Sequence, residues 1–142
     1  MATTTAQPQV FKYEYPAEEV KDKKVVRLCR SDILSAGMQV VVDGGETNLH
    51  AHGGNDGFWL VIEGRARFYG EGDALIADVG KLEGVLIPRG FPYWFESSGD
   101  VPLQILRVGA TAQNEKLERI NYTPMKDFYL EHHPDEAVNQ VR

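Results

Sequence analysis

The chain has 142 residues and a formal net charge of −6, with 42% hydrophobic and 25% charged residues. No run of lysines and arginines offers a nucleic-acid surface, and no apolar run approaches the ~18 residues of a membrane span. Cys29 is the only cysteine, which excludes an intrachain disulfide and a four-cysteine zinc site. We therefore expect one globular domain. We also expect a cytoplasmic protein, because the first residues lack the basic and apolar segments of a signal peptide.

The first 24 residues predict an N-terminal arm. Residues 1–9 are small and polar and are expected to be disordered. Residues 10–15 alternate aromatic and polar side chains, which is the pattern of an edge strand. Residues 16–24 are rich in charge and are compatible with one helical turn.

Residues 25–110 predict an antiparallel sandwich or barrel. All 14 glycines lie between Gly37 and Gly109, and short strands separated by frequent turns are typical of all-β domains. Glu63 and Gly64 directly separate two of these strands and predict a tight hairpin. The expected strands cover residues 25–29, 38–42, 58–62, 65–69, 74–79, 84–87, 93–96 and 101–108.

The last part of the chain, residues 111–142, differs from the barrel because it has no glycine and many charges. Residues 112–119 predict a helix. Residues 125–133 and 135–141 predict either short helices or an arm that packs on a partner chain. The aromatic residues of this tail and of the N-terminal arm need apolar surface to pack on, which favours a homodimer. Packing on the chain's own barrel is the alternative.

Two of the four histidines, His50 and His52, lie two residues apart. In a strand, residues i and i+2 point to the same face, so both imidazoles are able to converge on one metal ion. A pair of surface or hydrogen-bonded histidines is the alternative.

The surroundings of this pair carry a longer motif. The run from Gly44 through His50 and His52 to Gly64 resembles the first motif of the cupin family, G-x5-H-x-H-x3-4-E-x6-G. The aromatic and aliphatic run that ends in Glu-Gly is a recurrent part of that motif.

The second cupin motif, G-x5-P-x-G-x2-H-x3-N, is similar to residues 84–97. Pro88 and Gly90 match it, and Pro92 directly precedes the ligand position. The resemblance covers about residues 36–109. It implies an all-β, double-stranded β-helix or jelly-roll barrel, usually dimeric, with a metal or ligand site in its mouth.

The sequence departs from these motifs at the sites that matter. Gly57 stands at the position of the glutamate ligand, Tyr93 at that of the third histidine, and Ser97 at that of the asparagine. Leu82 stands where the second motif begins with glycine. Of the four usual ligands, only the two histidines of the first motif carry over directly.

Two residues are candidates to replace the missing ligands. Asp56 lies next to the glutamate position, and a β-bulge around residues 55–57 would turn it inward; a turn-forming aspartate is the alternative. Tyr93 is predicted to act as a metal ligand, as a hydrogen-bonding or acid group that faces a substrate, or as plain core.

Aromatic residues are expected to line the cavity. Trp59 and Phe95 share the ligand-facing side with Tyr93, which suits a small, partly apolar ligand; simple filling of a small barrel is the alternative. The candidates for holding an anionic ligand group are Arg65, Arg67 and Arg89. His132 and His133 lie in the tail, where a histidine from the tail or a partner chain would be able to complete the site.

Three functions follow from this pattern. The first is a mononuclear enzyme of the dioxygenase, lyase or isomerase type, with iron, manganese, nickel, copper or zinc on His50, His52 and Asp56, acting on a small organic substrate. The second is a metal-free isomerase or epimerase with a histidine base and Tyr93 as acid. The third is a non-catalytic cupin that binds a ligand.

Overall fold

The computed structural model describes residues 6–43, 45–113 and 115–125. The regular secondary structure of this part of the chain is almost entirely β-strand, and no helix in it is long and apolar enough to cross a membrane. The strands are β1 (Lys23–Arg30), β2 (Leu34–Val41), β3 (His50–Gly53), β4 (Asn55–Glu63), β5 (Ala66–Tyr69), β6 (Leu75–Val79), β7 (Gly84–Ile87), β8 (Trp94–Ser97), β9 (Leu103–Thr111) and β10 (Glu118–Asn121), with one 3-10 turn, η1 (Glu71–Asp73). Each of the eight predicted barrel strands overlaps an observed one.

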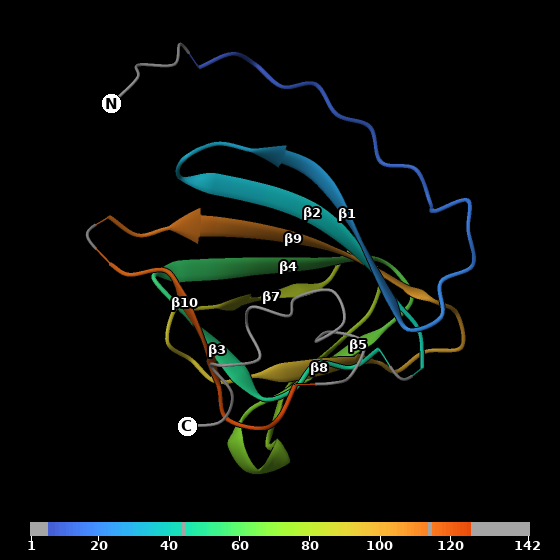
Figure 1. Cartoon of the computed structure of the whole chain (residues 1–142). Helices are drawn as coiled ribbons and strands as arrows, with labels where there is room; N and C mark the ends of the chain where they lie inside the picture. The colour runs from blue at the N-terminus through green and yellow to red at the C-terminus, as the bar shows by residue number, and fades with distance from the viewer. Residues whose placement is uncertain (1–5, 44, 114, 126–142) are drawn as a thin grey trace.

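The strands form two facing layers (Figure 1). One layer is a five-stranded antiparallel sheet in the order β1-β2-β9-β4-β7. The other contains the sheet β6-β5-β8 and the pair β10-β3, which an isolated bridge between His50 and Tyr93 joins. The layers are not closed into a continuous barrel. This arrangement has the jelly-roll form that the cupin resemblance implies.

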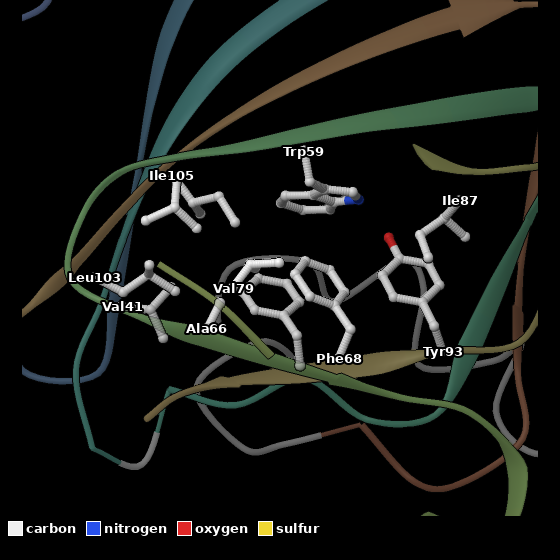
Figure 2. Packing of buried hydrophobic residues seen from close by; sticks show 11 residues of the cluster. Val41, Trp59, Ala66, Phe68, Val79, Ile87, Tyr93, Leu103 and Ile105 are labelled. Carbon is white, nitrogen blue, oxygen red and sulfur yellow. The ribbon is translucent and has the colours of Figure 1, made fainter. Parts of the chain in front are cut away.

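The core lies between the two layers and follows from the alternation of side chains along each strand. Trp59 from the five-stranded sheet faces Phe68 from the opposite sheet (Figure 2). The centroid of the Trp59 ring lies 5.7 Å from that of Phe68 and 4.9 Å from that of Phe95. These three side chains are at most 2% exposed. Full burial stabilises the fold by roughly 1.5–3 kcal/mol for each large apolar side chain, so this aromatic cluster holds the layers together.

The tight turn after β4 exists, but the predicted hairpin is wrong. Strand β4 pairs with β7 and β9, whereas β5 pairs with β6 and β8. Gly64 has a φ of +88°, and a Cβ atom on it would lie 3.1 Å from the carbonyl oxygen of Pro102. The turn therefore carries the chain from one layer to the other.

The predicted edge strand at residues 10–15 and the helical turn at residues 16–24 are also wrong. The arm has no strand pairing and is held by side chains: Gln9 donates to the carbonyl oxygen of Arg30, and the Tyr13 hydroxyl donates to Oε1 of Gln104. Phe11 and Tyr15 remain about half exposed, because the aromatic alternation finds no second apolar face to cover. The predicted homodimer stays a prediction.

The predicted helix at residues 112–119 is wrong as well. Strand β10 occupies the end of this segment and pairs antiparallel with β3, with Arg119 opposite His52 and Asn121 opposite His50. Pairing with a distant strand outweighs the local helical preference here. The predicted segments at residues 125–133 and 135–141 lie outside the described residues, apart from the buried Met125.

The turn at Gly64 provides a test of the fold. We expect Gly64→Ala to lower the free energy of unfolding by roughly 1–2 kcal/mol or more, because a side chain is strained at positive φ and its Cβ would press on the β9 backbone. The control is Gly72→Ala, since Gly72 has a φ of +64° but open space around its Cβ position. Urea denaturation of both variants makes the comparison, and an equal loss in both would contradict the close approach at Gly64.

Candidate functional site

The two histidines of β3 lie side by side in the interior, as their spacing predicts. Their ring centroids are 4.9 Å apart, and His50 is 2% exposed. The Nδ1 atom of His50 lies 2.6 Å from the carbonyl oxygen of Asn48. A carbonyl only accepts, so Nδ1 carries the proton and Nε2 is left as an acceptor. Strand β10 supports the pair from one side.

Both imidazoles are held in the neutral form. Burial, with Arg119 and His52 as further causes, lowers the pKa of His50 well below its usual value. Burial and the charges of Arg107, Arg119 and Lys23 lower the pKa of His52 to about 3. The residues around the pair are therefore cationic, whereas a metal-binding pair is ordinarily completed by an anionic ligand.

Tyr93 lies against the histidines, at the place that the second motif predicts. It exchanges two backbone hydrogen bonds with His50, of 3.0 and 2.8 Å, and the two ring centroids are 4.6 Å apart. Tyr93 is 1% exposed, and burial raises the pKa of its hydroxyl. Its side chain rises from the β8 side toward Trp59 and Ile87 (Figure 2). At neutral pH this residue is a buried, uncharged phenol.

The space beside Gly57 holds a guanidinium group. Arg107 of β9 lies opposite Trp59 of β4, and its Cζ is 5.6 Å from the centroid of the Trp59 ring. A Cβ atom on Gly57 would lie 3.6 Å from Nη2 of Arg107, and one on Gly109 would lie 2.9 Å from Nη1. Nη2 donates to Oδ1 of Asn55 at 2.9 Å. A positive charge therefore lies where the motif predicts a carboxylate.

Sequence reasoning missed Arg107, although a signal was available. The predicted strand at residues 101–108 alternates, and Arg107 follows the buried Leu103 and Ile105 at the same parity. That parity places its side chain on the inner face of the sheet.

Two further cations surround the histidines. Arg119 of β10 donates from Nη2 to Oδ1 of Asn48 at 2.7 Å and from Nε to Oδ1 of Asn121 at 2.9 Å. The ammonium nitrogen of Lys23 lies 5.5 Å from the centroid of the buried Phe95 ring. Burial, followed by the charges of Arg119 and Arg107, lowers the pKa of Lys23 to about 7.

Two predicted site residues do not join the histidines. The pairing of β4 with β9 is regular from Asn55 to Val61, so the bulge that would turn Asp56 inward is missing. Asp56 points outward and pairs with Arg89 at 3.2 Å. Arg67 lies on the outer face of β5 and pairs with Asp78 at 3.3 Å. Strand parity explains both positions.

The predicted aromatic residues Trp59 and Phe95 are buried in the core instead of lining an open cavity. Trp59 keeps one polar feature at the site. Its buried Nε1 atom lies 3.3 Å from the Cβ position of Gly57 and faces the Tyr93 hydroxyl. This donor is thus next to the Arg107 guanidinium.

Two cavities meet at Arg107. One of about 610 Å³ extends over the inner face of β1 and β2, and one of about 270 Å³ reaches His52 and Arg119. The residues that line both are Asn55, Arg107 and Leu117. Glu118, which pairs with Lys116 at 4.0 Å, also lines the smaller cavity. The mouth of the barrel is therefore open to a small molecule on the side where the cations gather.

The donor set does not fit a tightly bound transition metal. Within the described ranges, no three side chains of the histidine, cysteine, aspartate or glutamate type come together. What faces His50 and His52 is a neutral phenol and a guanidinium group, and neither supplies negative charge. His132 and His133 lie outside the described residues.

Comparisons with known proteins identify the fold. No family model and no curated protein matches the sequence. Solved structures are similar to it, and three of them serve as examples. An RmlC-like cupin protein from Desulfovibrio desulfuricans is 20% identical over 70% of this chain and 95% of its own, with a TM-score of 0.57. The Cnp3 cupin domain of Schizosaccharomyces pombe is 18% identical over 70% of this chain and 73% of its own, with a TM-score of 0.60. KdgF from a Halomonas species is 13% identical over 68% of this chain and 86% of its own, with a TM-score of 0.58. The chain has the cupin fold.

Lys23 gives a pH-dependent test of the site. Its pKa is about 7 in the folded chain against an ordinary 10.5, so between these values the unfolded chain binds a proton that the folded chain does not. The free energy of unfolding of the native protein is therefore expected to rise with pH from about 7 toward 10.5, relative to Lys23→Met. Denaturation at a series of pH values measures this difference. The control is Lys24→Met, which removes an exposed ammonium that pairs with Glu18. If the pH profile of Lys24→Met matched that of Lys23→Met, the buried position of Lys23 would be refuted.

Proposed function

We propose that this cupin-fold chain binds a small organic molecule in the mouth of the barrel, and that it does so without a metal on His50 and His52. The observation that carries the proposal is the change of residue and of charge at the position of Gly57. The glutamate that would complete a metal site is replaced by glycine, and the guanidinium of Arg107 fills the space beside it. A guanidinium repels a divalent cation and pairs with an anion.

The cavity geometry supports binding at this place. The larger of the two cavities that meet at Arg107, of about 610 Å³, has a size typical of small-molecule sites, and its lining mixes apolar with polar and charged side chains. The neutral His52 and the amide of Asn55 add hydrogen-bonding groups to the smaller cavity. These features favour the binding of a ligand whether or not a reaction follows.

The geometry favours binding over acid–base catalysis by a histidine and Tyr93. A base and an acid need a substrate between them, but the His50 and Tyr93 rings are neighbours, with centroids 4.6 Å apart. Tyr93 is also almost completely buried. The metal-dependent enzyme of the dioxygenase, lyase or isomerase type stays a prediction, and it would need an anionic ligand in addition to the two histidines.

Metal uptake tests the proposal. Protein purified without chelator and then incubated with iron, manganese, nickel, copper or zinc is expected to retain far less than one equivalent. One tightly held equivalent, lost in the double variant His50→Ala/His52→Ala, would refute the metal-free site.

A pair of variants sharpens this experiment. In Gly57→Glu/Arg107→Gln the missing carboxylate is supplied and the competing cation removed, so retention of a divalent metal is expected to rise at least about ten-fold, equivalent to ~1.4 kcal/mol. Gly57→Glu alone is the matched control, since its carboxylate would pair with Arg107 instead. Equal metal retention in the single and double variants would contradict the role assigned to Arg107.

A further inference from the structure

We propose that the ligand of this mouth is a small organic anion with an apolar body, and that Arg107 pairs with its charged group. The inference rests on the proposed function and names the chemical class of the ligand. The two faces of the barrel wall differ in how their arginines are paired with carboxylates.

Three arginines on the outer face are neutralised. Arg65 and Arg67 both pair with Asp78, at 3.0 and 3.3 Å. Arg89 pairs with Asp56 and Glu115, at 3.2 and 2.9 Å. In a chain of net charge −6 such partners are abundant.

On the inner face, the charge of Arg107 is not neutralised in this way. Within residues 6–43, 45–113 and 115–125, no carboxylate lies at ion-pair distance from Arg107 or from Lys23. The Asn55 amide oxygen, a neutral acceptor, holds one edge of the guanidinium. A partly buried guanidinium without a counter-ion is costly, and a bound anion would relieve that cost.

A second donor lies at the same place. Trp59 is 2% exposed, and its Nε1 atom points toward the Tyr93 hydroxyl, next to the Cβ position of Gly57 (Figure 2). Both Trp59 and Arg107 lie close enough to this hydroxyl to lower its pKa, although burial raises that pKa overall. A ligand that pairs with Arg107 would therefore change the surroundings of the Trp59 N–H.

The apolar body of the ligand follows from the larger cavity. Its lining includes the apolar side chains of Val25, Leu34 and Leu117, which are 51, 42 and 58% exposed, beside the charged side chains of Arg27, Arg30 and Asp32. The apolar side chains border the same cavity as Arg107. A molecule with its charged end at Arg107 and its apolar end over β1 and β2 would cover them and make hydrophobic contact.

Benzoate and benzamide are suitable probes because they have nearly the same shape and differ in charge. We would titrate each into the whole protein at constant ionic strength and follow the two tryptophan indole N–H signals by NMR. Trp59 reports on the site. Trp94 is an internal control, because its Nε1 donates to Asp73 on the surface at 3.0 Å.

The expected result is a saturable shift of the Trp59 signal with benzoate and an unchanged Trp94 signal. Benzamide is expected to bind at least about ten-fold more weakly. Arg107→Gln is expected to remove the preference for benzoate, whereas the matched control Arg67→Gln, which alters a paired outer arginine, is expected to keep it. If Arg107→Gln loses the native Trp94 signal, Arg107→Lys replaces it and is expected to weaken benzoate binding, because an ammonium lacks the planar fork.

The failures are distinguishable. Equal binding of benzoate and benzamide would overturn the preference for anions and leave the proposed small-molecule site intact. A Trp59 signal that neither probe moves, up to their solubility limits, would overturn the anion site, while the metal-uptake experiment still decides the proposed function independently. A benzoate effect that survives Arg107→Gln would overturn the role of this arginine.

Discussion

The double pairing of β9 is the constraint on which the interior of the barrel depends. Strand β9 lies between β2 and β4 and is in register with both, residue for residue over most of its length. A slip of one residue would turn Leu103 and Ile105 out of the core and bring Leu106 in. The two apolar residues thereby determine where Arg107 points. The burial of hydrophobic side chains supplies the free energy that holds a charged group inside.

Glycines on β4 and β9 leave space for the inward-facing side chain of Arg107. Gly57 and Gly109 are paired across β4 and β9, and both leave room for the guanidinium. This chain therefore has the two histidines of the first motif and a buried tyrosine where the second motif has a histidine, with a cation beside them where the first motif has glutamate. The proposed preference for an anion would follow from that change of charge on the same backbone.

The parts of the structure that sequence reasoning predicted are those with local causes. Alternation and turn residues gave the eight barrel strands, and the motif placed Tyr93 next to His50. The errors involve pairing between distant segments: β10 joins β3, and the turn at Gly64 joins two layers instead of two paired strands. For the same reason Arg107 was missed. A replacement for the glutamate was sought beside Gly57 in the sequence, at Asp56, but the group that fills the space comes from a strand about fifty residues later.

The position of β9 in the sheet also affects how the chain is made. Strands β1 and β2 pair with each other, but β2 and β4 find their shared neighbour only at Leu103–Thr111. During synthesis from the N-terminus, β1, β2 and β4 leave the ribosome with the central position of their sheet empty. Closing such long loops slows folding, and unpaired strand edges attract other chains. The five-stranded sheet is thus completed only after β9 has emerged, and until then the edges of β2 and β4 that pair with it are open.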